Sequence, residues 1–261
     1  MTIPKKLRTY IAGKSGHVDN VGMSGSSITV YDNCVLKIED VNPYTEENIR
    51  AMEYFQQRIP SPAVIYHEIE NGKSYLLMGR VPGKMSCDPS LLEQPDTVLQ
   101  ALADGLHLLW RTDTTGCPRI RTMSHLLQEA RWRVETGLVD LDNVQPETFG
   151  PDGFADPAHL LQWLEENPVP SVPVMTHGDY CLPNIFIQDG RFSGFVDVGD
   201  AGLGEKWRDI ALCWRSLRDN YRGRYGGKAY PDFDPDTLFE YLGVAPDWQQ
   251  IRYHLLLDEL F

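Results

Sequence analysis

The sequence predicts an α+β fold with a β-rich front of about 80 residues and a mostly helical rear. Two segments of the front, residues 26–38 and 63–78, each contain two β-prone runs around a turn pair. The turn pairs are Asp32-Asn33 and Asn71-Gly72. From Gln94 onward the apolar residues recur instead at spacings of three and four, as they do on the buried face of a helix.

A helix is predicted between the two hairpins, over residues 46–59, and Pro60 ends it because helices seldom continue into a proline. Its apolar face is formed by Met52, Phe55 and Ile59. Val81-Pro82-Gly83 interrupts the pattern after the second hairpin and is the expected linker. We therefore expect two domains, residues 1–80 and residues 81–261.

The rear is predicted to contain several helices and one small two-stranded insertion. The first helix carries an apolar stripe made of Val98, Leu102, Leu106 and Leu109. Further helices are expected at residues 123–134, 157–166 and 207–217, near Leu238 and at the C-terminus. The insertion is a hairpin over residues 184–197, with its turn at Asp189-Gly190.

Composition and charge limit the possible functions. Of the 261 residues 42% are hydrophobic, so the chain can bury a core. The net charge of −13 argues against binding to nucleic acid or to an acidic membrane, and it suits either a cationic partner or simple solubility. The five cysteines form no CxxC pair, and no segment resembles a leader or a membrane span. We expect a reduced, cytoplasmic protein that is a monomer or a weak dimer.

The strongest chemical feature is the segment from His177 to Asp197. It begins with His177-Gly178-Asp179, reaches Asn184 five residues later, and ends at Asp197 after the hairpin. Phosphoryl transfer needs a carboxylate to orient the acceptor hydroxyl and hard oxygen ligands to hold magnesium against the phosphates. Asp179 can serve as the catalytic base, while Asn184 and Asp197, at the two ends of one hairpin, can hold magnesium.

A cation for the phosphates is expected from the front. Lys37 lies in the apolar run Val35-Leu36-Lys37-Ile38, where burying a lysine is costly. It either extends along the strand edge to water or binds phosphate, and the Asp179 motif favours phosphate binding. The loop before this strand can present hydroxyl and N–H groups to phosphate, or simply turn the chain. Its serines are Ser24, Ser26 and Ser27.

These motifs resemble those of the aminoglycoside phosphotransferases, most closely the 3′-phosphotransferase branch. The spacing from Asp179 to Asn184 matches the HRDxxxxN pattern of protein kinases, with Gly178 in place of arginine. The likeness extends over nearly the whole chain. Its other pieces are Gly22-Met23-Ser24, Ile59-Pro60-Ser61-Pro62, Asn184-Ile185-Phe186, and residues 194–197, 206–211 and 257–261.

The resemblance implies a bilobal protein-kinase-like fold that binds ATP and Mg²⁺ between its lobes. It implies transfer of the γ-phosphoryl group to a hydroxyl, the 3′-hydroxyl, of a cationic aminoglycoside antibiotic, which confers resistance. It assigns Asp179 as the base, Asn184 and Asp197 as magnesium ligands, and Lys37 as the phosphate lysine. The implied adenine contacts are Met78, Gly79 and Val81. The implied substrate contacts are Asp179, Glu147, Asp200, Asp258, Glu259 and the carboxylate of Phe261.

Two positions depart from the family pattern. The family has a glutamate on the first helix that pairs with the lysine, and the matching position here is Asn48. The adjacent Glu47 either pairs with Lys37 or is an ordinary acidic residue at a helix start. Asp200 stands where close relatives have arginine, so it either changes which aminoglycosides bind or is a surface carboxylate in a loop.

Two other functions stay open on the sequence. A metabolic kinase for a sugar, amino alcohol or nucleoside would use the same centre, although an acidic C-terminal tail argues against a neutral sugar. That tail could also be a solvated chain end. A nucleotide-binding module without turnover is disfavoured by the intact set of Lys37, Asp179, Asn184 and Asp197, while the missing helix glutamate favours it.

Overall fold

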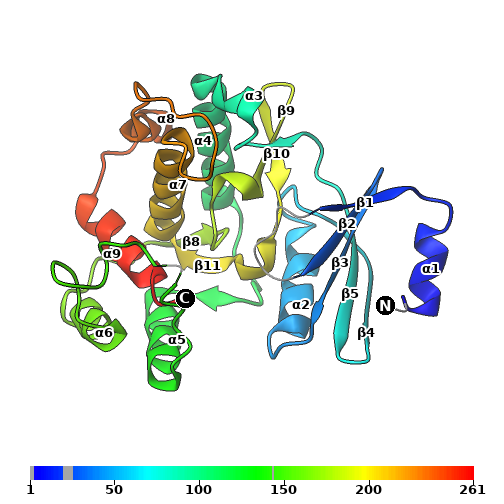
Figure 1. Ribbon diagram of the computed structural model, residues 1–261, viewed down its shortest axis with the longest axis horizontal. Coiled ribbons are helices and arrows are strands. Elements are labelled where there is room, and N and C mark those ends of the chain that lie inside the picture. Colours follow the sequence, from blue (N-terminus) through cyan, green and yellow to red (C-terminus); the bar gives the residue numbers. More distant parts are fainter. Residues whose placement is uncertain (1–2, 20–25, 143) are drawn as a thin grey trace.

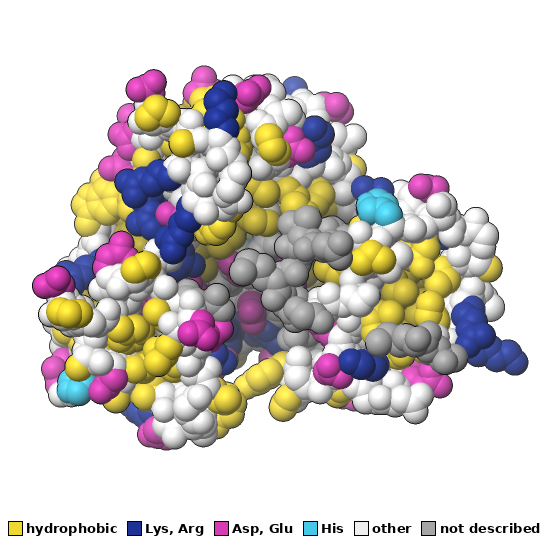
Figure 2. Space-filling model, in the orientation of Figure 1, with side chains coloured by type: hydrophobic (Ala, Val, Ile, Leu, Met, Phe, Trp, Pro, Cys, Tyr) yellow, Lys and Arg dark blue, Asp and Glu magenta, His cyan; other side chains and the backbone are white. Residues whose placement is uncertain are grey.

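In a computed structural model the chain forms an α+β fold, with a β-sheet region from its N-terminal part and a mostly helical C-terminal part (Figure 1). The structure describes residues 3–19, 26–142 and 144–261. The surface is hollowed between the two parts (Figure 2). The predicted domain boundary after residue 80 falls just beyond the last strand of the N-terminal sheet, and it stays a prediction.

The N-terminal sheet has five antiparallel strands in the order β1-β2-β3-β5-β4. Their bounds are Gly16–Asp19 (β1), Ser27–Tyr31 (β2), Cys34–Asp40 (β3), Val64–Glu70 (β4) and Lys73–Gly79 (β5). Both predicted hairpins are confirmed. Asn71 and Gly72 have φ angles of 51° and 74°, the left-handed pair that a two-residue turn between twisted strands requires. The sequence did not indicate β1 or the helix before it, Lys5–Ile11 (α1).

The predicted helix between the hairpins forms, but it is shorter than expected. Helix α2 spans Thr45–Phe55 rather than residues 46–59. The regular helix cannot continue through Pro60, because proline has no N–H to donate to Gln56 and its ring would clash with that carbonyl. The predicted apolar face is still buried, since Phe55 and Ile59 are 0% and 4% exposed.

The C-terminal part is organised around helix α4, which spans Pro95–Arg111. Its predicted stripe is fully buried, with Val98, Leu102, Leu106 and Leu109 all 0% exposed. The other helices are Pro89–Leu92 (α3), Met123–Thr136 (α5), Pro157–Glu166 (α6), Lys206–Tyr221 (α7), Leu238–Leu242 (α8) and Trp248–Asp258 (α9). Within the described ranges, the helices are all too short or too polar to cross a membrane.

The prediction of a single two-stranded insertion in the rear is wrong. The hairpin Ile185–Gln188 (β9) and Arg191–Phe195 (β10) has a third strand, Lys84–Met85 (β6). A second sheet has the order β7-β11-β8, with bounds Ile120–Arg121, Gly202–Glu205 and Pro173–Thr176. Two-residue strands show no hydrophobic period, and Gly-Leu-Gly-Glu in β11 is a poor strand sequence.

The core of the C-terminal part gives the first testable prediction. Leu102→Ala should lower the free energy of unfolding by about 2–5 kcal/mol, because a fully buried side chain would leave a cavity. Urea unfolding followed by circular dichroism measures this. The control Leu141→Ala removes a side chain that is 55% exposed, and it should change stability by less than about 0.5 kcal/mol. Equal losses in the two variants would contradict the assignment of α4 to the core.

Candidate active site

The segment His177-Gly178-Asp179 leaves strand β8 in a turn that only glycine accommodates at its centre. Gly178 has a φ angle of 88°, in the left-handed region. A Cβ atom at this position would overlap the backbone carbonyl of Asp200. Glycine therefore lets the Asp179 loop and the loop after Asp197 pack backbone to backbone.

A buried carboxylate on α7 holds this turn in place. Asp209 accepts the N–H of His177 at 2.7 Å and the N–H of Gly178 at 3.0 Å, one on each oxygen. Burial raises the pKa of Asp209 to about 6, against the opposing effects of His177, the two N–H bonds and Arg208. The two bonds give Asp209 a structural role, because they hold the backbone of the catalytic loop against α7.

The imidazole of His177 joins the loop to the following hairpin. Its Nε2 lies 2.9 Å from the carbonyl oxygen of Val196, and its Nδ1 lies 3.3 Å from the backbone nitrogen of Asp179. One tautomer satisfies both bonds, with Nε2–H donating and Nδ1 accepting. Fully buried and bonded on both nitrogens, His177 shapes the loop.

Asp179 and Asn184 are in direct contact. The Asn184 side-chain amide donates to the Asp179 carboxylate at 2.8 Å and to the Asp179 carbonyl at 3.0 Å. Both side chains are half-buried. Because its Nδ2 is used in this way, Asn184 has its Oδ1 left to meet a cation.

The hairpin brings Asp197 beside Asn184, as the sequence predicted. The N–H of Val196, the residue before Asp197, donates to the carbonyl of Asn184 at 2.9 Å. Asp197 is exposed and has a φ angle of 55°, a conformation that is costly for a residue with a side chain.

Lys37 on β3 faces the same centre from the N-terminal sheet. Burial alone would lower the pKa of Lys37, but the nearby carboxylates of Asp197, Glu39 and Asp200 together raise it. Its ion pair is with Glu39, two residues along the same strand, at 2.9 Å. The positive charge is therefore held next to Asp197, where phosphates would lie.

The suggested pair between Lys37 and Glu47 is not the one that forms. Glu47 lies 3.1 Å from the Nε of Arg119, and Asn48 accepts from the same guanidinium at 2.5 Å. Asp200 also lies against Arg119, at 3.2 Å, although its side chain is 59% exposed. The departures from the family pattern thus meet at Arg119 rather than at Lys37.

The remaining predicted nucleotide contacts are only partly described. Ser24 lies outside the described residues. Ser26 is half-buried and Ser27 is exposed at the start of β2. Met78 and Gly79 end β5, and Val81 is 7% exposed. Their contacts with adenine stay predictions.

The C-terminal tail differs from expectation at Asp258. Both of its oxygens are bonded to guanidinium groups, of Arg208 at 2.8 Å and of Arg215 at 2.6 Å. Although burial opposes it, these two charges lower the pKa of Asp258. Arg208 also donates to the carbonyl of Gly178 at 3.2 Å. Asp258 therefore joins the tail to the catalytic loop, and its expected role as an ammonium ligand stays a prediction.

Glu259 and Phe261, at the end of the tail, also contact other groups of the protein. Glu259 accepts the backbone N–H of Gln145 at 2.7 Å, and burial raises its pKa. The backbone oxygen of Phe261 accepts a hydrogen bond from Arg133 at 3.0 Å. Three guanidinium groups lie over its aromatic ring, each with its central carbon 5.2–5.8 Å from the ring centroid. These cations are Arg121, Arg133 and Arg208.

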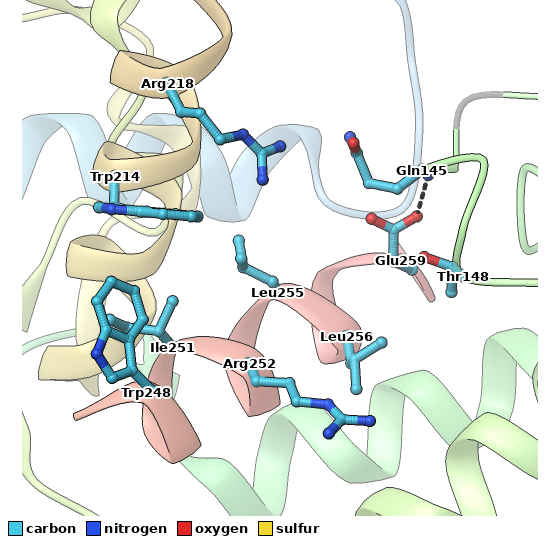
Figure 3. A pocket seen from close by; sticks show the side chains of 10 residues that line it. All are labelled: Gln145, Thr148, Trp214, Arg218, Trp248, Ile251, Arg252, Leu255, Leu256 and Glu259. Atoms are coloured by element: carbon cyan, nitrogen blue, oxygen red, sulfur yellow. Dashed lines mark hydrogen bonds between the residues drawn. The ribbon is translucent and has the colours of Figure 1, made fainter. Parts of the chain in front are cut away.

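A hollow lies beside the tail, between α7, α9 and the loop after α5. Figure 3 shows Trp214 and Arg218 extending from α7 toward side chains of α9, with Glu259 and Gln145 at the far end. Two adjoining cavities of about 310 and 500 Å³ share six lining residues. Glu147 is exposed and lines the larger one together with Arg215. Lys and Arg side chains also gather on this face in Figure 2.

Sequence reasoning missed the arginines of this centre. Arg208 lies inside the matched 206–211 segment, so that motif could have signalled it. Arg119, Arg215 and Glu39 had no such signal, since a single charged residue in a loop or on a helix resembles a solvated one. Their partners lie 2 to 81 residues away in the sequence.

The buried carboxylate gives the second prediction. Asp209→Ala leaves two buried N–H groups without an acceptor and should lower the free energy of unfolding by about 2–4 kcal/mol. Urea unfolding measures it, with the exposed Asp104→Ala as a control that should be nearly neutral. An equally small effect at Asp209 would contradict its role.

The same residue predicts a pH dependence. The pKa of Asp209 is raised to about 6 in the folded state. As the pH rises, the unfolded chain therefore loses this proton at a lower pH than the folded chain does. The stability of the natural protein relative to Asp209→Asn should therefore fall as the pH rises from about 4 to about 6, and then level off. A relative stability that rises over this range would contradict the raised pKa.

The chain matches known proteins over most of its length. The model of the phosphotransferase enzyme family matches residues 35–254. Aminoglycoside 3′-phosphotransferases from Enterococcus faecalis and Staphylococcus aureus are each 31% identical, and each alignment covers 100% of this chain and 99% of the relative.

The fold has solved counterparts. The aminoglycoside phosphotransferase APH(3″)-Id from Streptomyces rimosus superposes with a TM-score of 0.77 at 22% identity, covering 97% of this chain and 95% of that one. The same protein in complex with ADP and streptomycin superposes with a TM-score of 0.74. The protein-kinase-like fold expected from the sequence is thereby confirmed. The family model and the full-length relatives establish that this chain belongs to the aminoglycoside phosphotransferase family of phosphotransferase enzymes.

Proposed function

We propose that the protein transfers the γ-phosphoryl group of ATP to the 3′-hydroxyl of an aminoglycoside antibiotic and so confers resistance. The observation that carries this proposal is the convergence of Asp179, Asn184 and Asp197 in one bonded loop with Lys37 facing it. The full-length likeness to aminoglycoside 3′-phosphotransferases supports the acceptor and the hydroxyl.

Asp179 acts as the base. Its carboxylate, oriented by Asn184, accepts the proton of the acceptor hydroxyl as that oxygen bonds to the γ-phosphorus. The bond from the γ-phosphorus to the bridging oxygen breaks, and ADP leaves. Lys37 neutralises charge on the phosphates, and Ser24, Ser26 and Ser27 contact them from the preceding loop. Met78, Gly79 and Val81 contact the adenine.

The donor set suits magnesium. Asn184 has its Oδ1 available because its Nδ2 bonds to Asp179, and Asp197 is an exposed carboxylate beside it. In the part of the chain that the structure describes, no group of three or more His, Cys, Asp or Glu residues could hold a metal. Two protein ligands completed by phosphate oxygens is the usual arrangement for magnesium, which supplies charge neutralisation at the phosphates.

The acceptor is proposed to lie along the cavity beside the tail. Glu147 and Glu259, which line the cavities, are its proposed ammonium ligands. The terminal carboxylate of Phe261, Asp258 and Asp200 are proposed as further substrate contacts on the family resemblance alone. Arg215 and Arg218 line the same cavity. Because these arginines repel a polycation, we expect the protein to accept only aminoglycosides whose ammonium groups reach the carboxylates. A cytoplasmic location and a monomeric or weakly dimeric state stay predictions.

The third prediction concerns the base. Asp179→Ala should lower kcat/KM for an aminoglycoside by about 100- to 10,000-fold, the usual contribution of a general base. Nucleotide affinity should be largely unchanged, because Asp179 faces the acceptor. The measurement is ATP consumption with kanamycin and neomycin, with Asp104→Ala as a control. Near-natural turnover of Asp179→Ala would rule out this assignment.

A wider panel separates the proposed function from its alternatives. Turnover with a sugar, amino alcohol or nucleoside but with no aminoglycoside would indicate a metabolic kinase. Nucleotide binding without turnover of any acceptor would indicate a binding module. Either result would overturn the proposed acceptor.

The fourth prediction concerns the acceptor site. Glu259→Gln should raise KM for the aminoglycoside about tenfold, the loss of one charge-assisted contact of about 1.4 kcal/mol. KM for ATP should stay the same, because Glu259 lines the cavity beside the tail. Steady-state kinetics measures both constants. The exposed Glu166→Gln on α6 is the control, and an unchanged aminoglycoside KM in Glu259→Gln would remove this residue from the site.

A further inference from the structure

Arg119 lies where helix α2 meets the loop that follows Asp197. Its side chain is only 6% exposed. On one side it donates to Glu47 at 3.1 Å and to Asn48 at 2.5 Å, both on α2. On the other side it donates to the carbonyl of Gly199 and to the carboxylate of Asp200, the latter at 3.2 Å. A single guanidinium therefore joins α2 to the loop.

The base of this side chain is fixed as well. The carbonyl of Arg119 accepts the N–H of Leu203 at 3.0 Å, next to the pairing of β7 with β11. Gly202 packs so closely on that carbonyl that an added Cβ would lie 2.7 Å from it. The guanidinium thus extends from an anchored backbone, and its planar set of donors suits several acceptors at once.

No other charged link between α2 and the centre is found among residues 3–19, 26–142 and 144–261. Lys37 pairs with Glu39 on its own strand, and the helix position expected to hold a glutamate is Asn48. Asp200 stands where an arginine was expected. The two residues that depart from the family pattern, Asn48 and Asp200, both bond to Arg119. Its guanidinium gives Asp200 a cationic partner and gives Asn48 a hydrogen-bond donor.

The loop that Arg119 holds includes a strained residue. Asp197 has a φ angle of 55°, and Val198–Asp200 follow as a single 3₁₀ turn. The left-handed conformation costs free energy for a residue with a side chain, although aspartate and asparagine tolerate it best, as Asn71 and Asp189 do in turns. The bonds from Arg119 to Gly199 and Asp200 fix the end of this turn, while the bond from Val196 to Asn184 fixes its beginning.

We propose that Arg119 is a positioning residue that locks the Asp197–Asp200 loop to α2 and thereby sets the orientation of Asp197 toward the magnesium–nucleotide. The inference rests on the proposed phosphoryl transfer but not on the identity of the acceptor. Arg119 acts through Asp197 and does not itself contact the nucleotide.

Hydrogen exchange of the protein without ligands tests the lock directly. Arg119→Met should raise amide exchange in peptides covering Val198–Asp200 and in α2, and leave the α4 core unchanged. The control Arg131→Met removes a surface arginine that pairs with Glu165 at 2.5 Å, and it should leave both segments as they are. Unchanged exchange in the loop and in α2 of Arg119→Met would overturn the proposal.

Kinetics separates positioning from a general loss of structure. Arg119→Met should raise KM for magnesium–ATP about tenfold or more, lower kcat, and shift magnesium activation to higher concentration. KM for the aminoglycoside should change little, and Arg119→Lys should recover only part of the loss because lysine cannot bond to four acceptors. Natural values of kcat and of KM for magnesium–ATP in Arg119→Met would overturn the proposal.

Two further measurements keep the test independent of folding and of the acceptor. If Arg119→Met does not fold, the double variant Glu47→Gln/Asn48→Ala weakens both bonds between Arg119 and α2, and it should raise KM for magnesium–ATP in the same direction. Magnesium-dependent nucleotide affinity, measured by calorimetry, should weaken in these variants even if no aminoglycoside is turned over. That outcome would reject the proposed acceptor and still support Arg119, whereas unchanged affinity in every variant would reject Arg119 alone.

Discussion

The active centre depends on one buried carboxylate that accepts two successive backbone N–H groups. Asp209 holds His177 and its neighbour, His177 bonds to the carbonyl of Val196, and Val196 donates to the carbonyl of Asn184. Asn184 then donates to Asp179. Each link fixes the next, so Asp179 and Asn184 inherit their positions from α7, while Asp197 lies between Val196 and the turn that is bonded to Arg119. Hydrogen bonds in such a chain are strong because they are shielded from water.

The proximity of Asp179, Asn184 and Asp197 could be predicted from the sequence because the three are close along the chain, while their roles stay predictions. Asp179, Asn184 and Asp197 lie within one loop and one hairpin, and hairpin pairing is a local property with a clear turn signal at Asp189-Gly190. The burial of the α4 stripe followed from helical spacing for the same reason. The predicted end of α2 was wrong, because Pro60 removes the hydrogen bond to Gln56 and so breaks the last predicted turn.

The parts that sequence could not supply are long-range charge pairings. Arg119 reaches Glu47 and Asp200, at separations of 72 and 81 residues, and Arg215 reaches Asp258 over 43 residues. Nothing in a single charged residue specifies its partner, because any of several carboxylates could satisfy it. The suggested Lys37–Glu47 pair failed in this way: Glu39 lay nearer on the strand, and Arg119 bound the helix carboxylate instead.

The same pairings separate the overall charge from the local field. A net charge of −13 attracts a cation over long distances, but beside the tail two arginines already neutralise Asp258 and others line the cavity. Attraction toward the protein and selection within the cavity are therefore governed by different groups. Since Glu259 also lies 3.7 Å from Arg215, and an Arg133 nitrogen lies 3.0 Å from the backbone oxygen of Phe261, the spacing of ammonium groups on the acceptor, rather than their number, should decide which molecules bind productively.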